Sequence, residues 1–289
     1  MSAWKAENKR EPDQTAALSS SQPDRRASGQ QAPSAQPTTA DPSTTQVQRF
    51  LAELLGTFLL VLFHGGASAS LRVIAGSAQA APSPQSIAFL AFIDGFSLFM
   101  IIMIIGKISG VLINPAVTIG LAIRRRFPRN EVPVYLAAQF VGATLGAAAI
   151  MPTIGRDALT IGHLGAVQLA PGVSVWQGML VEALGAFVLV LTISATAEDP
   201  RSPSGWAAFA IGMALFAIVM LFESITGAPV NPARAFGPDL LDALLGVPVK
   251  WGDYALCYLL APIVGASIAT TLYRYLANQP NKKPEPEPD

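Results

Sequence analysis

The sequence contains two stretches, ISGVLINPAVTIG at residues 108–120 and ITGAPVNPARAFGP at residues 225–238, that repeat one pattern. In each, a Ser-Gly or Thr-Gly pair precedes Asn-Pro-Ala, and a further glycine follows. Asparagine is a favourable N-cap, and proline suits the first turn of a helix because its missing N–H would be unpaired there. Each Asn-Pro pair is therefore predicted to start a helix, one after Asn114 and one after Asn231.

Six long apolar segments surround these motifs, at residues 47–71, 85–106, 132–151, 174–196, 205–223 and 254–277. Each is close to the roughly 20 residues that a helix needs to cross a hydrocarbon core. The two pieces that begin at the Asn-Pro pairs, residues 114–124 and 231–244, are too short to do so. They are predicted to be either re-entrant half-helices or surface helices.

The composition agrees with a polytopic membrane protein. Of the 289 residues, 51% are hydrophobic and only 13% are charged, and the formal net charge is zero. Of the 38 charged residues, ten lie in residues 1–46 and five in residues 281–289. The depleted middle cannot form a soluble surface, for which roughly 25% charged residues are usual. Without a basic excess, nucleic-acid binding is excluded.

Cysteine and histidine are too scarce for metal or disulfide chemistry. Cys257 is the single cysteine, so no intramolecular disulfide and no cysteine metal site can form. The two histidines, His64 and His163, are too few for a zinc or haem centre without many carboxylates beside them. The sequence therefore predicts neither a metal site nor a cofactor.

Polar segments flank the apolar region. Residues 1–46 are rich in Ser, Gln, Pro and Thr, and the chain ends in KKPEPEPD. Such segments bury too little apolar surface to offset the entropy of ordering them. Residues 1–46 and 278–289 are therefore predicted to be disordered tails around a membrane domain at residues 47–277.

Basic residues indicate how the spans are oriented. The termini and the even-numbered connections hold Arg49, Arg124, Arg125, Arg126, Arg129, Arg201, Arg274, Lys282 and Lys283. The other connections hold only Arg72, Arg156 and Lys250. Because basic loops stay in the cytoplasm, both termini are predicted to be cytoplasmic.

The two halves of the membrane domain, residues 47–151 and 174–277, match each other in three blocks. E-x-x-G-x-F starts at Glu53 and again at Glu182, each half contains one Asn-Pro-Ala motif, and Ala138–Ala143 matches Ala261–Ala266. Each half has three spans, an odd number, so the second half must insert upside down. The two half-helix N-termini would then meet near the bilayer midplane, where their dipoles repel cations.

With these motifs and this repeat, the chain resembles the aquaporin and aquaglyceroporin family, the major intrinsic proteins, over about residues 47–277. The resemblance implies an all-α membrane fold of six transmembrane helices plus two re-entrant half-helices. It also implies a homotetramer in the lipid bilayer of the cell membrane, with one pore per subunit and no enzymatic activity. Water and small neutral solutes would pass the motif residues, which are Asn114, Pro115, Ala116, Asn231, Pro232 and Ala233.

The resemblance places the selectivity filter at Asp94, Val219, Ala228 and Arg234. Arg234 would donate hydrogen bonds to the solute and oppose cations. Val219 and Ala228 lack the bulk and polarity of the histidine that water-selective members often place on the fifth helix, which favours glycerol, urea or metalloid acids. Ala235 stands where typical glycerol facilitators carry aspartate, which favours water. The solute range therefore stays open.

Asp94 departs from the aromatic residue that is usual at its position in the family. An ionisable residue inside a span costs about 2.5–3.5 kcal/mol on insertion scales and is a functional candidate by default. The hypothesis is that Asp94 faces the pore and pairs with Arg234. The alternative is that Asp94 bonds to a neighbouring helix.

Five other residues are given structural roles or exclude a function. Glu53 and Glu182 are expected, from the family, to bond the half-helix backbone. His64 is predicted to be a satisfied buried histidine, and Gln139 is grouped with the glycines that permit close helix packing. Leu112 stands where the family commonly has histidine, so pH gating through that residue is not expected.

Two other classes of membrane protein fit parts of the pattern. An ion-coupled secondary transporter could also have inverted repeats, but it would need ionisable residues at the midplane, where this chain has Asn114 and Asn231. A membrane enzyme would need a cluster of His, Asp or Glu at one membrane face, and no such cluster is evident in the sequence.

Overall fold

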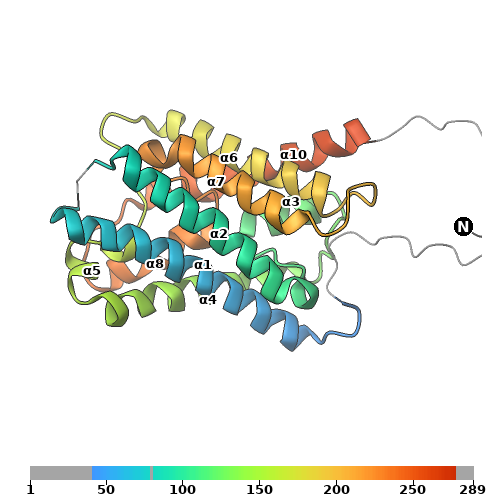
Figure 1. Cartoon of the computed structure of the whole chain (residues 1–289), viewed down its shortest axis with the longest axis horizontal. Coiled ribbons are helices and arrows are strands. Elements are labelled where there is room, and N and C mark those ends of the chain that lie inside the picture. The colour runs from blue at the N-terminus through green and yellow to red at the C-terminus, as the bar shows by residue number, and fades with distance from the viewer. Residues whose placement is uncertain (1–40, 79–80, 278–289) are drawn as a thin grey trace, which may run out of the picture. The chain divides into compact units, whose positions relative to one another are not determined.

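A computed structural model describes residues 41–78 and 81–277, and the regular secondary structure within these residues is entirely helical (Figure 1). Six segments are long and apolar enough to cross a membrane. They are α1 (Gln46–Ala75), α2 (Pro84–Ser109), α4 (Val132–Ile154), α6 (Val175–Thr196), α7 (Ala207–Thr226), and a last one built from α9 (Trp251–Asp253), a π-helical stretch η2 (Tyr254–Leu260) and α10 (Ala261–Ala277). Two shorter helices, α3 (Pro115–Ile123) and α8 (Pro232–Leu244), begin directly after the motif asparagines. The connection from α4 to α6 contains α5 (Asp157–Thr160) and a 3₁₀ turn, η1 (His163–Gly165).

The predicted fold of six spans and two half-helices is confirmed. The observed spans start and end within four residues of the predicted boundaries. Glycines in the left-handed conformation end three of them, with φ of 66° at Gly76, 82° at Gly110 and 77° at Gly227. Glycine adopts this conformation without a Cβ penalty, so it is the usual residue at a helix C-terminus.

Helix packing follows the predicted inverted repeat. The first and third spans of each half pack together, α1 with α4 and α6 with α10, and the second spans, α2 and α7, pack on each other. Each half-helix packs on the third span of the other half, α3 on α10 and α8 on α4. Most residues of α3 and α8 are buried. Both are therefore half-helices inside the bundle, and the surface-helix alternative is excluded.

Glycines permit the closest helix approaches, at matching positions of the two halves. A Cβ added at Gly142 of α4 would lie 2.3 Å from the carbonyl oxygen of Leu54 in α1. A Cβ added at Gly265 of α10 would lie 2.0 Å from the carbonyl oxygen of Ala183 in α6. A side-chain carbon cannot occupy either place, so the close packing predicted for these glycines is confirmed.

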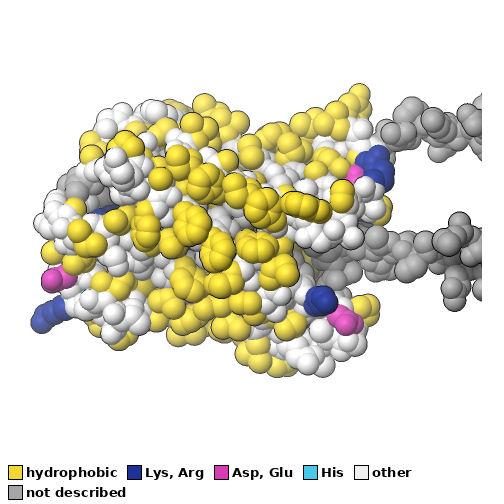
Figure 2. Space-filling view, in the orientation of Figure 1, with side chains coloured by type: hydrophobic (Ala, Val, Ile, Leu, Met, Phe, Trp, Pro, Cys, Tyr) yellow, Lys and Arg dark blue, Asp and Glu magenta, His cyan; other side chains and the backbone are white. Residues whose placement is uncertain are grey.

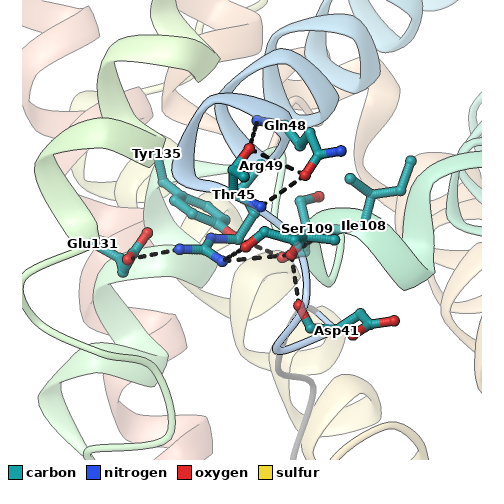
Figure 3. Close-up of polar contacts among 9 residues, drawn as sticks. Asp41, Thr45, Gln48, Arg49, Ile108, Ser109, Glu131 and Tyr135 are labelled. Carbon is teal, nitrogen blue, oxygen red and sulfur yellow. Dashed lines mark hydrogen bonds and ion pairs between the residues drawn. The ribbon is translucent and has the colours of Figure 1, made fainter.

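Polar contacts tie the start of α1 to the end of α2 (Figure 3). Thr44 Oγ1 donates to the carbonyl oxygen of Ile108 at 3.2 Å, and Thr45 caps α1. Arg49 Nη1 donates to the carbonyl oxygen of Thr44 at 2.6 Å, and Arg49 Nη2 lies 3.0 Å from Glu131 Oε1. The chain that leads into α1 is thereby fixed to α2 and α4.

The predicted tails fall almost wholly outside the described residues. Residues 1–40 and 278–289 are not described, so the disorder predicted for the tails stays a prediction. Of the predicted N-terminal tail only residues 41–46 are described, and α1 begins at Gln46.

Apolar side chains cover the sides of the helices. On the face shown in Figure 2, hydrophobic side chains spread over the middle of the bundle and the visible charged side chains lie near its two ends. Phe92, Met103, Leu180 and Leu221 are each more than half exposed on spanning helices. Large exposed apolar surfaces mark contact with a partner or a membrane, and here they belong to six membrane-length helices. The chain is a multi-pass membrane protein.

Basic side chains gather at one end of the bundle. Arg124, Arg125, Arg126, Arg201 and Arg274 line one cavity of about 660 Å³, which marks what we call the basic end. A second cavity, of about 120 Å³, contains Arg72 and Lys250 and marks the opposite end. These members of the two predicted sets of basic residues thus lie in separate cavities.

Candidate pore

The two half-helices meet through their asparagines. Asn114 Nδ2 donates to the carbonyl oxygen of Val230, and Asn231 Nδ2 donates to the carbonyl oxygen of Ile113, both at 2.9 Å. Each Oδ1 accepts from the backbone N–H two residues later, at 2.9 Å and 3.0 Å. The predicted N-cap role of both asparagines is confirmed. Each amide nitrogen carries a second N–H, which these bonds leave available to a solute.

The loops that precede the asparagines have the same unusual backbone in both halves. Val111 and Ile113 have φ of 51° and 37°, and the matching Ala228 and Val230 have φ of 39° and 40°. Residues other than glycine seldom adopt positive φ, and β-branched residues do so least. Such strain persists only where surrounding contacts impose it. The buried glutamates supply these contacts.

Glu53 of α1 holds the first loop. Its Oε1 accepts from Ser109 Oγ at 2.7 Å and from Leu112 N at 2.9 Å. Its Oε2 accepts from Ile113 N at 2.6 Å and from Gln139 Nε2 at 2.8 Å. The interpretation of Gln139 as a simple packing residue is wrong, because its amide fixes the orientation of the carboxylate.

Glu182 of α6 holds the second loop in the same way. Its Oε1 accepts from Thr226 Oγ1 at 2.6 Å, and its Oε2 accepts from Val230 N at 2.9 Å. Both carboxylates are completely buried. The backbone-supporting role expected of Glu53 and Glu182 is therefore what the structure shows.

Two tyrosines complete the support, and neither was predicted from the sequence. Tyr135 Oη donates to the carbonyl oxygen of Ser109 at 2.8 Å, and Tyr258 Oη donates to that of Thr226 at 2.9 Å. Ser109 and Thr226 are the last residues of α2 and α7. The tyrosines therefore fix the points at which the chain leaves a spanning helix to form a pore loop.

Replacing Glu53 with glutamine is expected to lower the Tm more than replacing Glu182 does. Glutamine has one acceptor oxygen and one NH₂ group. Its NH₂ would therefore face hydrogen-bond donors that are now paired with a carboxylate oxygen. Glu53 accepts four hydrogen bonds and Glu182 accepts two. Each buried donor left without a partner costs about 1–3 kcal/mol. Tryptophan fluorescence of detergent-solubilised protein measures the Tm, and equal losses for the two variants would contradict this reason.

A funnel leads from the basic end to the asparagines. It has a volume of about 460 Å³ and apolar walls from α1, α2, α6 and α7, and its lining includes Asn114 and Asn231. Asp199, at the wide end, is also part of the arginine-lined cavity. Arg201 Nε donates to Asp199 Oδ1 at 2.9 Å, and this contact holds the pKa of the Asp199 carboxyl below its usual value.

The inverted repeat relates the funnel to the predicted filter. Counterparts in the other half are found by aligning Gly110 with Gly227. The counterparts of all four predicted filter residues line the funnel, namely Ile211 for Asp94, Ile102 for Val219, Val111 for Ala228 and Val117 for Arg234. Inverted repeats place equivalent residues on opposite sides of the central asparagines. This relation favours a pore-lining position for the four residues in the opposite half of the bundle.

Arg234 is almost completely buried and is held by the connection before α6. Its Nη1 donates to the carbonyl oxygen of Gly165 at 2.8 Å, while its Nε and Nη2 have no hydrogen-bond partner among the described residues. A Cβ at Gly165 would lie 2.3 Å from the Cα of Gly65, so this connection rests directly on α1. Arg234 is thereby placed at the level of Gly65.

The predicted ion pair between Asp94 and Arg234 is wrong, because Asp94 pairs with His64. Asp94 Oδ2 contacts His64 Nδ1 and joins α2 to α1, and within the described part of the chain Asp94 makes no ion pair with Arg234. Both residues are buried. The alternative, a bond to a neighbouring helix, is what the structure shows. His64 is only partly satisfied, since its Nε2 has no hydrogen-bond partner among the described residues.

Two further charged residues at this site were not predicted. Glu223 of α7 interacts electrostatically with His64, Asp94, Arg234 and Arg72. Arg72, in the last turn of α1, donates to two carbonyl oxygens that flank η1. The guanidinium groups of Arg72 and Arg234 and the carboxyl groups of Asp94 and Glu223 therefore share one region, on the side of the asparagines opposite the funnel. In the aligned repeat, the counterpart of Glu223 is Gly106, which also lines the funnel.

Known proteins with similar sequences span nearly the whole described chain. The family profile described as "Major intrinsic protein" matches residues 41–273. Aquaporin AqpM of Methanothermobacter marburgensis is 40% identical over 245 residues, which cover 80% of this chain and 98% of that protein. The probable aquaporin AqpM of Archaeoglobus fulgidus is 42% identical over 246 residues, which cover 81% and 99%.

A facilitator and a solved structure are also similar. The glycerol uptake facilitator protein of Bacillus subtilis is 32% identical over 238 residues, which cover 78% of this chain and 83% of that protein. The X-ray structure of the aquaglyceroporin from Plasmodium falciparum aligns with a TM-score of 0.70 at 25% identity, covering 79% of this chain and 96% of that one. The profile, the relatives and the pair of crossed asparagines lead to one conclusion: the chain belongs to the major intrinsic protein family.

Proposed function

We propose that this protein is a passive channel for water and small uncharged solutes. The observation that carries the proposal is the crossed pair of Asn114 and Asn231 at the inner end of the funnel. Two half-helix N-termini meet there, and their positive dipole ends oppose cations. The spare amide N–H groups offer hydrogen bonds to a neutral solute. Relatives named as aquaporins and as a glycerol uptake facilitator support the proposal.

The selectivity filter in this proposal consists of Asp94, Val219, Ala228 and Arg234. All four are buried, with exposed fractions of 0% or 1%, and their counterparts in the repeat line the funnel. The unpartnered Nε and Nη2 of Arg234 provide hydrogen-bond donors at this level. Asp94 belongs to this filter together with His64, which it contacts.

A facilitator of glycerol, urea or metalloid acids with little water selectivity is the second candidate. Val219 and Ala228 are small and apolar, so the constriction accommodates a solute larger than water. Ala235, also buried, stands where the resemblance to glycerol facilitators would place aspartate, and this weakens the second candidate. The similar proteins include an aquaporin and a glycerol uptake facilitator.

An ion-coupled transporter is a third candidate, and one observation favours it. His64, Asp94 and Glu223 place ionisable side chains inside spans, which such a mechanism requires. The family relationship weighs against it, because the matched relatives are named as aquaporins and a facilitator. Saturation and dependence on an ion gradient would distinguish this mechanism from a channel.

Reconstituted protein is expected to carry water and neutral solutes down their gradients without saturation. Proteoliposomes and empty liposomes are compared by stopped-flow light scattering, with osmotic shocks of impermeant solute, glycerol, urea and boric acid. We expect shrinkage and re-swelling well above those of empty liposomes, unchanged when sodium or proton gradients are collapsed. Rates equal to those of empty liposomes would overturn the channel, and saturable, ion-dependent flux would support the transporter. The relative permeation rates of water, glycerol, urea and boric acid distinguish a water-selective filter from one that admits larger neutral solutes.

The orientation and assembly are also proposals. We infer that the basic end faces the cytoplasm of a cell membrane, which places both termini there. The resemblance to the family supports a homotetramer with one pore per subunit and no enzymatic activity. Light scattering of the detergent complex measures the subunit number, and labelling of a cysteine placed beside Arg126 in intact cells and in lysed cells tests the orientation.

A further inference from the structure

We propose that His64 is a specificity-determining residue of the pore, and that its pair with Asp94 forms the hydrogen-bond acceptor side of the constriction opposite the donors of Arg234. The proposal rests on the channel function proposed above. It adds to the filter a residue of the first spanning helix, which lies outside the four positions placed by the resemblance.

The inverted repeat places His64 on the pore. Aligning Glu53 with Glu182 makes Ile193 the counterpart of His64, and Ile193 lines the funnel. The counterpart of Asp94, Ile211, lines it too. Helix α1 is continuous from Glu53 to His64, and helix α6 is continuous from Glu182 to Ile193, so the alignment of the glutamates also aligns His64 with Ile193. His64 and Asp94 therefore occupy, in the opposite half, the position of two funnel-lining isoleucines.

Contacts place His64 and Arg234 at the same level. His64 precedes Gly65, against which Gly165 packs, and the carbonyl oxygen of Gly165 accepts from Arg234 Nη1 at 2.8 Å. His64 also interacts electrostatically with Arg234 and with Glu223. One imidazole, one guanidinium and two carboxylates thus share one level of the bundle.

Unpartnered buried atoms point to a solute at this level. His64 Nε2, Asp94 Oδ1 and Arg234 Nε and Nη2 are buried and have no hydrogen-bond partner among the described residues. Buried polar atoms are almost always paired, since desolvation without a partner is costly. These unpartnered acceptors and donors lie on residues that face each other across the proposed pore. A solute that both donates and accepts hydrogen bonds would pair with them.

The contact with Asp94 assigns the acceptor to His64 Nε2. His64 is buried, and burial favours the neutral imidazole over its charged form. Because Nδ1 faces the Asp94 carboxylate, Nδ1 carries the proton of the neutral ring. Nε2 is then an acceptor.

The test compares His64→Leu with His64→Gln in proteoliposomes, with glycerol and water as probes. Leucine removes the acceptor, whereas glutamine can donate to Asp94 with its NH₂ and accept with its oxygen. One net hydrogen bond corresponds to about a three- to tenfold change in rate. We expect the ratio of glycerol to water permeability to fall by about three- to tenfold in His64→Leu and to stay within about twofold of wild type in His64→Gln.

The control is Glu131→Gln, which breaks another ion pair made by α1, that of Arg49 at the basic end. It should leave the ratio unchanged. If His64→Leu does not reconstitute, His64→Phe, which keeps a ring, provides the same comparison. A folded apolar variant with the wild-type ratio, or a glutamine variant that loses as much as leucine, overturns the proposal. A wild-type protein that conducts neither probe refutes the channel function itself, so the two failures are distinguishable.

Discussion

Replacing Gly265 with alanine is expected to prevent the bundle from assembling. The added Cβ would lie 2.0 Å from the carbonyl oxygen of Ala183, and the next nearest atoms are also backbone. A flexible side chain could move aside, but here α6 or α10 must shift as a whole. Overpacking in a core usually costs about 1–3 kcal/mol, and a backbone clash at this distance should exceed that range. Gly142→Ala, with 2.3 Å to the carbonyl oxygen of Leu54, should behave similarly.

The measurement is size-exclusion chromatography of the detergent extract from equal amounts of membrane. Gly265→Ala should lose the monodisperse peak of the wild type. Gly66→Ala is the matched control, because it is the same change inside a spanning helix and its Cβ would meet only an isoleucine methyl group, at 3.7 Å. A wild-type peak and Tm for Gly265→Ala would refute the claim that the α6–α10 crossing requires glycine.

The architecture was predictable because its signals are local. A run of about 20 apolar residues is long enough to span a bilayer wherever it occurs, and an Asn-Pro pair starts a helix whatever surrounds it. The inverted repeat then follows from the odd number of spans in each half. The internal irregularities did not follow from such signals. The π-helical stretch Tyr254–Leu260 interrupts the last span, and although Gly252 and Pro262 stand just outside it, neither residue specifies a π-helix.

The support of the pore loops was only partly predictable. The glutamates lie in a repeated block and were identified, whereas Tyr135 and Tyr258 were not. A signal for them existed, since each stands three residues before the third repeated block. Their hydroxyls reach carbonyl oxygens at the ends of α2 and α7, and a bond from a side chain to a distant backbone atom leaves no trace in local periodicity.

The partner of Asp94 could not be found from spacing. Asp94 and His64 lie on different helices, so their contact depends on the rotation of α1 and α2 about their axes. Spacing from the motifs fixes a position along a helix but not which neighbour the side chain meets. Arg234 was the nearest charge that the motifs provided, and the structure instead joins Arg234 to a backbone carbonyl oxygen.

The chemistry of the two pore halves differs although their backbones match. On the basic side of the asparagines the repeat places Ile193, Ile211 and Gly106, and the funnel is apolar. The equivalent residues in the other half are His64, Asp94 and Glu223. Selection by hydrogen bonding is therefore concentrated in one half of the proposed path, because the funnel wall between the asparagines and the polar residues at 196–204 is apolar.

Replacing either motif asparagine with aspartate is expected to reduce osmotic permeability by about tenfold or more. Aspartate has the same shape and still accepts from the first N–H groups of the half-helix, but it cannot donate. In Asn114→Asp a carboxylate oxygen would face the carbonyl oxygen of Val230, where a bond of 2.9 Å now exists. Asn231→Asp does the same to Ile113. Leaving a buried carbonyl unpaired costs about 1–3 kcal/mol, and 1.4 kcal/mol corresponds to a factor of ten.

The two variants should fail to a similar extent, because the repeat makes their contacts equivalent. Stopped-flow light scattering at matched protein-to-lipid ratio measures the loss, and size-exclusion chromatography confirms that the helices still assemble. Asn130→Asp, the same change at an exposed residue of the α3–α4 connection, should conduct like the wild type. If folded Asn114→Asp conducts water normally, the crossed hydrogen bonds do not hold the pore open, because the loops would then keep their shape through Glu53 and Glu182 alone.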